Sequence, residues 1–209
     1  MMAQPAELGA VLAQARADLT RTDVSREQLH RHLARLVPAV ENLLAHAEDL
    51  TDLLDQARTC PVTGLPTRAA WTALADARLK AGPAAAVVFA DLDAFKPIND
   101  RFGHHAGDAV LAAVGQRLRA WCASDGHAGR LAGDEFVAVV TATPHLPRRI
   151  ERLEAALASP IDYEGVSLTV GASIGVARQD MLGTTDLSAL LGAADAAMYQ
   201  AKKRGRRGR

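Results

Sequence analysis

Two acidic turns that lie far apart in the sequence contain the side chains best suited to chemistry. The first carries Asp91 and Asp93 directly after an apolar run, and the second carries Asp134 and Glu135 in a glycine-containing turn. Adjacent carboxylates repel each other, so we expect a positive partner beside them, most simply a hard divalent cation bound through oxygen atoms. An ordinary polar hairpin with solvated acids would explain the second turn alone. The first turn, with its own strand, favours a shared metal site.

A phosphate site is predicted directly after the first acidic turn. Pro97 suits the first position of a helix, so the backbone amides of 94–96 would face outward at a helix N-terminus, beside the Lys96 ammonium group. Asn99 and Asp108 place further polar groups on the next turn and helix. These residues predict a cradle for phosphate groups next to the acidic turns.

The last residues of the chain are strongly basic. Lys202 precedes Arg206 by four residues, so both cations share one face if the last helix extends that far. The alternative is a frayed, solvated tail, and we adopt it for 207–209. Residues 59–201 carry more acidic than basic side chains, so nucleic-acid binding by this part of the chain is not predicted.

Strands and helices must place these turns. The run Ala84–Ala90 is continuous and apolar, which predicts a central strand, and Phe136–Val140 predicts a second buried strand. Gly133 allows the positive φ of a tight hairpin between them and 127–131. Further elements are expected as helices over about 67–80, 107–122, 146–157 and 187–203 and as a long strand over 166–177. This order predicts an α+β, ferredoxin-like fold with helices flanking a mainly antiparallel central sheet.

An N-terminal helical extension is predicted before this body. A short helix is expected over 6–20, and Ser25–Gln28 is a capping box that starts a second helix. Apolar residues then alternate in steps of four and three, at positions 29, 33, 36, 40, 43, 47, 50, 54 and 57. This heptad pattern favours a coiled coil or an antiparallel helix pair, and Pro38 predicts a kink or a new helix. The alternative is that these helices fold back onto the body as ordinary core.

The two parts meet at Cys60–Pro66, where two prolines and a glycine end the helical pattern. We therefore predict a dimerising helical stalk over 1–58, a body over 59–206 and a basic tail over 207–209. The chain of 209 residues, 49% hydrophobic and 23% charged, is typical of a globular protein with a sizeable core.

Cysteine usage and hydropathy bear on the compartment. Cys60 and Cys122 fit no metal or redox spacing, so we expect two reduced thiols. No apolar run approaches the ~20 residues needed to span a bilayer, and the N-terminus has no export signal. We predict a cytoplasmic protein with no membrane span.

Five motifs that occur in order between Cys60 and about Arg206 resemble those of the GGDEF family of diguanylate cyclases. They are Pro61–Pro66, Asp91–Lys96 with Asn99–Asp100, Gly103–His104 with Gly107–Asp108, Ala132–Phe136, and Ala194–Tyr199 with Ala201–Lys202 and Gly205–Arg206. Each motif is weak alone, but together they are highly specific. The resemblance implies a nucleotidyl-cyclase-type central sheet and an enzyme that condenses two GTP molecules into cyclic di-GMP and two pyrophosphates.

The resemblance also implies roles for individual residues. The residues that match the magnesium (or manganese) site are Asp91, Leu92 through its carbonyl group, Asp134 and Glu135. Those that match the triphosphate contacts are Ala94, Phe95, Lys96, Lys202 and Arg206, and those that match the guanine-binding pair are Asn99 and Asp108. Asp134, Glu135 and Lys96 would carry the catalytic step. Because each body would hold one GTP, the resemblance implies a homodimer, and the N-terminal helices could contact a regulatory protein.

Three departures from the family pattern bear on function. Ala132 replaces the first glycine of the signature, which matters if that position needs positive φ or approaches a phosphate closely. Cys60 and Thr67 replace a common Asp and Asn in the junction. The window Ala123–Gly126 does not match the family's Arg-x-x-Asp product-inhibition motif, so we expect no feedback there. The alternative to an active cyclase is a catalytically inactive module that binds GTP or a cyclic dinucleotide and signals through its helices.

Overall fold

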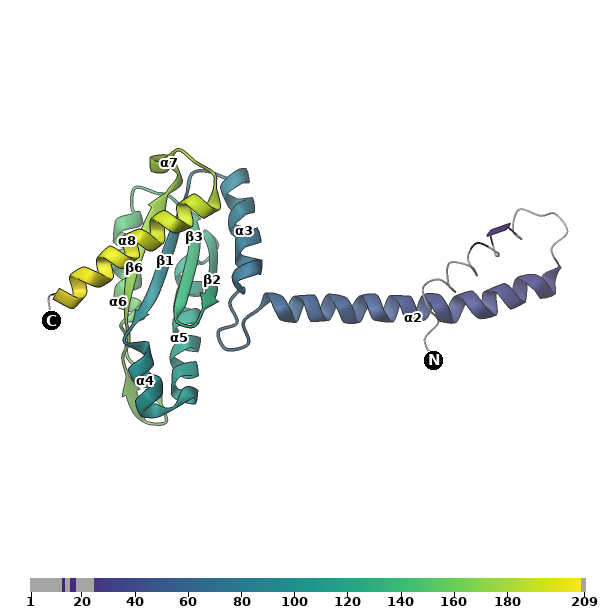
Figure 1. Ribbon diagram of the computed structural model, residues 1–209, viewed down its shortest axis with the longest axis horizontal. Helices are drawn as coiled ribbons and strands as arrows, with labels where there is room; N and C mark the ends of the chain where they lie inside the picture. The colour runs from purple at the N-terminus through teal and green to yellow at the C-terminus, as the bar shows by residue number, and fades with distance from the viewer. Residues whose placement is uncertain (1–12, 14–15, 18–24, 208–209) are drawn as a thin grey trace. The chain divides into compact units, whose positions relative to one another are not determined.

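The structure is a computed structural model that describes residues 13, 16–17 and 25–207 (Figure 1). The chain divides into two compact units, Met1–Gln56 and Ala57–Arg209, which are described separately. The helix expected over 6–20 lies largely outside the described residues, as do residues 208–209 and the side chain of Arg206.

The first unit contributes most of α2, a helix that begins at Arg26 and ends at Arg58. Its start is the expected capping box, because the Ser25 N–H donates to Gln28 Oε1 (2.9 Å) and the Gln28 N–H donates to Ser25 Oγ (3.2 Å). Pro38 was expected either to kink the helix or to start a new one. It lies inside α2, so no new helix starts there. Among the described residues, no helix is long and apolar enough to cross a membrane.

One stripe of α2 consists of exposed apolar side chains. The large apolar residues of this helix that are at least 46% exposed are Leu33, Val37, Val40, Leu43, Leu44, Leu50, Leu53 and Leu54. Most of them occupy the heptad positions of the sequence pattern. A surface helix normally turns such a stripe toward a packing partner, because apolar area exposed to water is unfavourable.

The second unit is built on a four-stranded antiparallel sheet in the order β2-β3-β1-β6 (Figure 1). Its strands are β1 (Ala85–Asp93), β2 (Gly126–Ala132), β3 (Glu135–Thr141) and β6 (Gly171–Arg178). The sequence of β1 is apolar from Ala85 to Ala90, because this central strand is covered on both faces, and the acids Asp91 and Asp93 lie at its end. This topology confirms the predicted α+β, ferredoxin-like fold.

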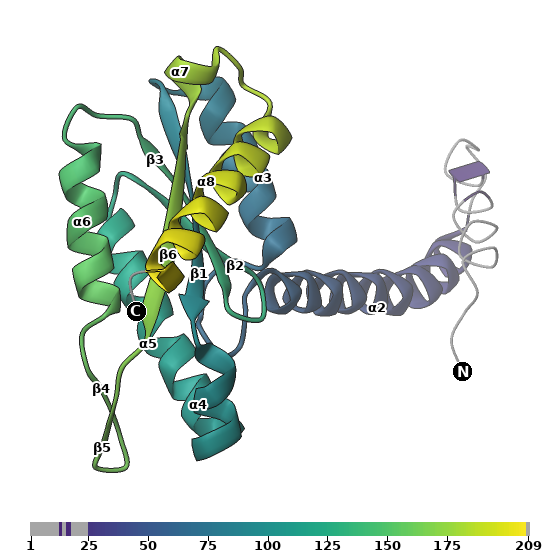
Figure 2. The same ribbon diagram turned by 60° about the vertical axis from the view of Figure 1, so that its left-hand side comes forward.

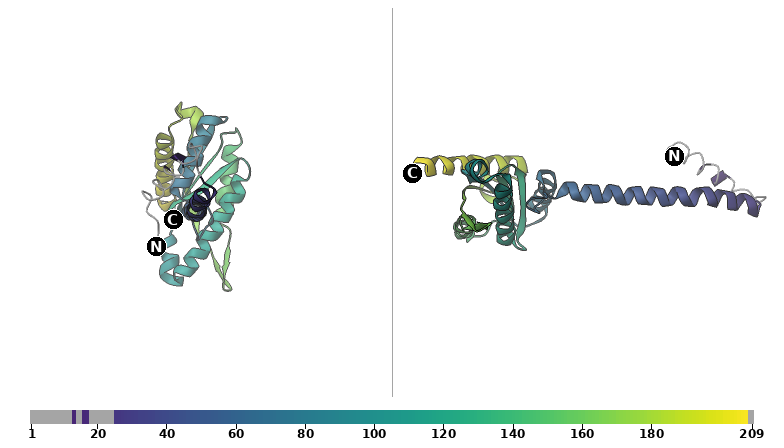
Figure 3. Two further views of the ribbon diagram at one scale, coloured as in Figure 1. Left: turned by 90° about the vertical axis from the view of Figure 1, so that its right-hand side faces the viewer. Right: turned by 90° about the horizontal axis from the view of Figure 1, so that it is seen from below.

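Helices cover both faces of the sheet (Figure 3). On one face, α3 (Arg68–Ala81) and α8 (Leu187–Arg207) pack against alternate β1 side chains such as Val87 and Phe89. On the other, α5 (His104–Cys122) and α6 (Leu146–Leu157) pack against Val88, Ala90 and Leu92. The two-residue period of β1 therefore assigns Asp91 to the face of α3 and α8.

The region predicted as one strand over 166–177 is different in the structure. A short hairpin of β4 (Ile161–Tyr163) and β5 (Val166–Leu168) precedes β6 and is not part of the main sheet. Its two-residue turn contains Glu164 and Gly165, both with positive φ, as tight hairpin turns require. The prediction was wrong because the apolar residues of β5 and β6 continue one pattern and hide the break between them. The short helices α4 (Phe95–Phe102) and α7 (Gln179–Leu182) complete the unit.

Candidate functional site

The two acidic turns of the sequence lie side by side at one end of the sheet. Asp91 of β1 and Glu135 of β3 are directly opposite each other in the antiparallel ladder. The Leu92 N–H donates to the Asp134 carbonyl oxygen (3.2 Å), so the backbones of the two turns also touch. Opposed residues in a ladder point their side chains to the same face of the sheet, so both acids lie on one face at this point.

The signature turn, defined as residues 132–135, is a tight turn in which Gly133 has a φ of +45°. Ala132 is not among the described residues with positive φ, and it pairs with Glu135 at the end of β2. The methyl group of Ala132 therefore imposes no left-handed strain on the turn. This was the first of the two conditions under which the alanine would have mattered.

Lys202 of α8 brings a cation to the acidic pair. Its ammonium group forms a short ion pair with Asp91 Oδ1, and the two side chains are only 28% and 16% exposed. Helix α8 extends to Arg207, beyond the expected end at 203 and into the expected tail, so the backbone of Arg206 follows Lys202 by about one helical turn. A residue expected to contact phosphates thus touches a residue expected to bind metal.

Arg68 is a second cation at this site, and sequence reasoning did not identify it. It is the first residue of α3, and its Nη2 lies 3.9 Å from Glu135 Oε2. Both side chains are largely exposed, so the ion pair is weak. The only signal in the sequence was the position of Arg68 directly after the junction.

Asp93, the other acid of the first turn, has a different partner. It accepts a hydrogen bond from Ser173 Oγ of β6 (2.8 Å), and Ser173 is buried. Gly171, also on β6, has no side chain and allows Asp93 to lie close to its backbone. Asp93 therefore fixes the end of β1 to β6, whereas Asp91 faces Lys202.

The predicted phosphate cradle lies at the start of α4, directly after β1 (Figure 2). Ala94 precedes the helix in a left-handed backbone conformation (φ +55°), and its side chain forms no capping hydrogen bond. Phe95, the first residue of the helix, is buried. Lys96 is exposed in that turn. Pro97 is the third residue of α4, not the first as predicted, because the turn after β1 is shorter than expected.

Asn99 and Asp108 come from two helices that pack together. The Asn99 side chain lies against Gly107 of α5, where a Cβ atom would be 1.8 Å from Asn99 Oδ1. A side chain at 107 would therefore displace the Asn99 side chain from its place against α5, which carries Asp108. Asp108 is exposed, as a residue that contacts a ligand in solution would be.

Metal binding by this site would depend on ligands from outside the chain. Among the described residues, no group of three or more His, Cys, Asp or Glu side chains is close enough to hold a metal ion. Asp91 and Glu135, with the nearby Leu92 carbonyl group and Asp134, offer oxygen donors to a hard cation. Mg²⁺ is commonly held by one or two carboxylates together with substrate phosphates and water. The donors of the site fit that kind of metal binding.

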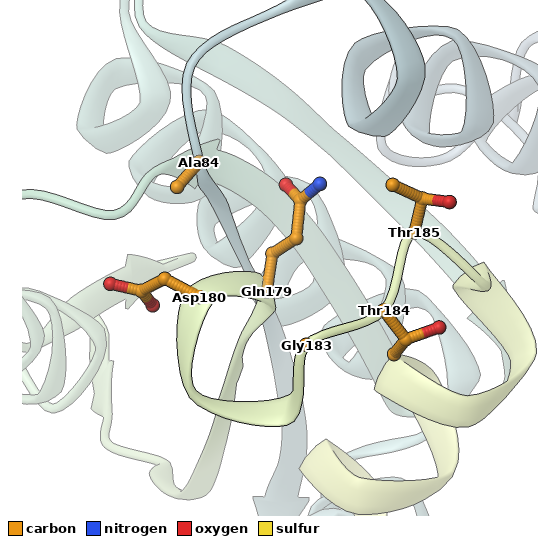
Figure 4. Close-up of a pocket in the computed structure, with 6 residues that line it drawn as sticks. All are labelled: Ala84, Gln179, Asp180, Gly183, Thr184 and Thr185. Carbon is orange, nitrogen blue, oxygen red and sulfur yellow. The ribbon is translucent and has the colours of Figure 1, made fainter.

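A pocket lies at the opposite end of β1 (Figure 4). It is lined by Ala84, Gln179, Asp180, Gly183, Thr184 and Thr185. The Gln179 amide is already bonded there, since it accepts from the Ala85 N–H (2.9 Å) and donates to the Leu79 carbonyl (3.1 Å). None of the predicted metal, phosphate or guanine contacts lines this pocket.

Comparison with known proteins identifies the second unit. The family described as "Diguanylate cyclase, GGDEF domain" matches residues 57–208. An uncharacterized 19.3 kDa protein from the repSA 5′ region of Streptomyces ambofaciens is 48% identical over 163 residues, covering 78% of this chain and 88% of that protein. The diguanylate cyclase DgcP of Escherichia coli (strain K12) is 39% identical over 158 residues, covering 72% of this chain.

The similarity extends to solved structures. A crystal structure of a sensory box/GGDEF family protein from Caulobacter crescentus CB15 matches with a TM-score of 0.63 and 36% identity, covering 71% of this chain and 99% of that chain. The match to DgcP spans 46% of the length of DgcP, so the similarity concerns one part of that protein. The family match covers most of the chain and includes both acidic turns. The chain therefore belongs to the GGDEF-domain diguanylate cyclase family.

Proposed function

We propose that this protein is a diguanylate cyclase that joins two GTP molecules into cyclic di-GMP and releases two pyrophosphates. The observation that carries the proposal is the juxtaposition of Asp91 and Glu135, with Lys202 against Asp91, at the end of the sheet. Two carboxylates beside the ammonium group of a long, flexible lysine side chain suit a magnesium-bound triphosphate. The names of relatives such as DgcP agree with this activity.

The residues would divide the work of the reaction. Asp91, Asp134, Glu135 and the Leu92 carbonyl group would hold Mg²⁺ or Mn²⁺, which when bound neutralises charge and lowers the pKa of a coordinated hydroxyl group. Lys96, Lys202 and Arg206 would bind the triphosphate with the amides of Ala94 and Phe95. The 3′-oxygen of each GTP attacks the α-phosphorus of the other, and each attack breaks the bond from that phosphorus to pyrophosphate, so two pyrophosphates leave. Asp134 is the candidate to accept the proton of that hydroxyl group.

Asn99 and Asp108 would select guanine. A carboxylate accepts hydrogen bonds from guanine N1–H and N2–H₂ together, and adenine offers no such pair of donors. The contact of Asn99 with Gly107 supports this proposal, because Gly107 directly precedes Asp108 in α5. Both halves of the product would then be guanine nucleotides.

A homodimer is required because each body binds one GTP. Two bodies must face each other, and the exposed apolar stripe of α2 supplies a surface for a second copy of the chain. Pairing through α2 would raise the local concentration of the second half-site. The same helix could also contact a regulatory protein.

Product feedback through the Ala123–Gly126 window is not part of the proposal. Asp125, the only acid of that window, is bonded within the body to Arg149 (2.6 Å) and to Thr141. Its carboxylate therefore joins the residue before β2 to the end of β3 and to α6.

The second candidate is a catalytically inactive module that binds GTP or a cyclic dinucleotide. Ala132 in the signature favours it, but the negative-φ position of this residue weakens the argument. The test is incubation of the purified full chain with GTP and Mg²⁺, followed by chromatography. Cyclic di-GMP with two equivalents of pyrophosphate supports the cyclase, whereas GTP that binds and stays intact supports the inactive module.

A further inference from the structure

The end of α2 and the start of α3 are connected by a closed loop, residues 58–67, which we call the junction loop. The Thr67 N–H donates to the Arg58 carbonyl (2.8 Å), and Thr59 and Pro66 form an antiparallel bridge. The two ends of the loop are therefore fixed to each other. The last residue of α2, Arg58, is thus bonded to the last residue of the loop.

Arg130 of β2 connects the junction loop with the signature turn. Its backbone N–H donates to the Pro66 carbonyl (3.0 Å), and its Nη1 lies 3.2 Å from Cys60 Sγ. The same guanidinium donates through Nε (2.9 Å) and Nη2 (2.7 Å) to the Gly133 carbonyl oxygen. One side chain thus bonds to both segments at once.

The signature turn depends on this side chain because its own ladder is irregular. The register of β2 against β3 shifts between Arg130 and Ala132, with Leu131 as the extra residue. No atom outside the turn lies within 4 Å of a Cβ built on Gly133, so packing does not support the turn from that side. The two guanidinium bonds to the Gly133 carbonyl supply the support that regular pairing would give.

We infer that Arg130 is a positioning residue that sets the placement of Asp134 and Glu135 according to the state of the junction loop. This inference rests on the proposed function and names a route for its regulation. A change at the end of α2 would move the loop, and Arg130 would carry that change to the turn. Arg68, directly after the loop and 3.9 Å from Glu135, is a second and weaker link.

The bond between Arg130 and Cys60 has an ionic component. Burial alone would raise the pKa of the Cys60 thiol, but hydrogen bonds from the side chain and backbone of Thr63, from Arg130 and from the backbone of Val62 lower it to about 7. Near neutral pH a substantial share of the thiol is therefore thiolate, and a hydrogen bond from a guanidinium to an anion is stronger than one to a neutral group. Arg130 is the charged group among these partners of the thiol.

Two arginine variants separate this link from general loop stability. Arg130→Gln removes the contacts to Cys60 and Gly133, and Arg119→Gln is the matched control. Arg119 also bonds to the junction loop, through its Nη2 and the Gly64 carbonyl, but comes from α5 and has no described bond to the signature turn. Both substitutions remove one charge and a bond to the same loop.

The first measurement is the pH profile of Cys60 alkylation by iodoacetamide in the full chain, followed by intact mass. The midpoint should lie near the pKa of about 7 in the wild type and in Arg119→Gln and should move upward in Arg130→Gln. Cys122 does not interfere, because it is buried and burial raises its pKa to about 12. An unchanged midpoint in Arg130→Gln would contradict the contact on which the inference depends.

The second measurement is the split between kcat and KM for GTP. Arg130→Gln should lower kcat by about tenfold or more through misplacement of the turn, while KM changes little, since α4, α5 and α8 carry the nucleotide-binding residues. Arg130→Lys should recover part of kcat, and Arg119→Gln should stay near wild type. Equal losses in the two glutamine variants would reduce Arg130 to a structural residue.

A readout without turnover distinguishes failure of this inference from failure of the proposed function. If the wild type forms no cyclic di-GMP, the cyclase proposal fails by itself. The positioning role of Arg130 is then tested by Mn²⁺ binding, measured by electron paramagnetic resonance in the presence of a non-hydrolysable GTP analogue. Mn²⁺ affinity that falls in Arg130→Gln and not in Arg119→Gln supports the link, and equal affinities in the two variants overturn it.

Discussion

Two acid–cation pairs in the body have the same charges and similar burial but different surroundings. Asp125 pairs with Arg149 (2.6 Å), with the side chains 34% and 24% exposed. Asp91 pairs with Lys202, with the side chains 16% and 28% exposed. Exposure and charge therefore do not explain why one pair is structural and the other is a candidate for function.

The Asp125 pair is fixed by additional contacts on both sides. Asp125 also accepts a hydrogen bond from Thr141, and the Arg149 guanidinium lies 5.0 Å from the centre of the Trp121 ring. Burial opposes ionisation of Asp125, but the bonds from Thr141 and Arg149 and the charge of Arg149 outweigh it and lower the pKa of the carboxyl group. Each partner would lose several interactions if the pair opened.

The Asp91 pair is placed where its partners can be exchanged. Asp91 lies opposite Glu135, a second carboxylate whose described partner, Arg68, is 3.9 Å away. Lys202 is a single flexible ammonium group near the end of α8. A metal ion could take the place of Lys202 at Asp91, and Lys202 could then bind the phosphates that accompany the metal. The neighbours of an ion pair, and not its charges, thus distinguish the two pairs.

The largest effect should come from removing the charge of Glu135, which lies opposite Asp91. Glu135→Gln should lower the rate of cyclic di-GMP formation by about 10²–10³-fold, with little change in thermal stability, because its ion pair is exposed and long. Chromatographic product assays and thermal unfolding measure the two effects. Asp76→Asn, which removes an exposed acid paired with Lys80 on α3, is the control. Comparable losses in both variants would contradict a specific role for Glu135.

The next largest effect concerns Lys202. Lys202→Gln should weaken binding of a GTP analogue by about tenfold, or ~1.4 kcal/mol, and should strengthen Mn²⁺ binding in the absence of nucleotide, because Asp91 is then unpaired. Lys203→Gln is the matched control, since its ammonium group lies 4.3 Å from the centre of the Tyr199 ring and has the same charge. Calorimetry measures both affinities. Equal affinities of Lys202→Gln and Lys203→Gln for the GTP analogue and for Mn²⁺ would contradict this role of Lys202.

The structural pair should respond in stability and not in activity. Asp125→Asn should lower the free energy of unfolding by about 1–2 kcal/mol and leave turnover within about twofold of wild type. Because the pKa of Asp125 is lowered in the folded state, its contribution is present above the ordinary aspartate pKa and is lost as pH falls through the folded value. Urea unfolding of both proteins should therefore converge in acid. A loss of turnover greater than twofold in Asp125→Asn would contradict a purely structural role for this pair.

The smallest effect should come from Cys60. Its lowered pKa means that its stabilising contribution is fully present above pH 9 and is lost as pH falls toward about 7. The difference in unfolding free energy between wild type and Cys60→Ser should grow across this window by ~1 kcal/mol, after discounting for partial exposure. Urea titrations at pH 6.5 and 9 test this prediction. A difference that is constant or shrinks with pH would contradict the thiolate–guanidinium bond.

Local patterns in the sequence predicted much of the fold. The continuous apolar run of β1 predicted its central place, and the helix over Leu146–Leu157 was predicted to the residue. Gly133 was expected to take positive φ and does so. The β4–β5 hairpin was missed, because two short apolar runs separated by a turn look like one strand when no pairing partner is known.

The candidate site was predictable only where motifs identify residues. Asp91 and Glu135 were assigned to one site from their two acidic turns and by resemblance, and the ladder places them opposite each other. Arg68 and Arg130 were not identified, because their contacts depend on where long side chains point after folding. The ion pair of Lys202 with Asp91 was also not foreseen, since 111 residues separate the partners.

The central claim is that acids from two distant turns bind one metal ion together with the phosphates of a guanine nucleotide. The most direct test is Mn²⁺ binding to the full chain in the presence of a non-hydrolysable GTP analogue, for wild type, Asp91→Asn and Glu135→Gln. Each single substitution should weaken Mn²⁺ binding by about tenfold or more. Mn²⁺ affinity that is unchanged by both substitutions would contradict it.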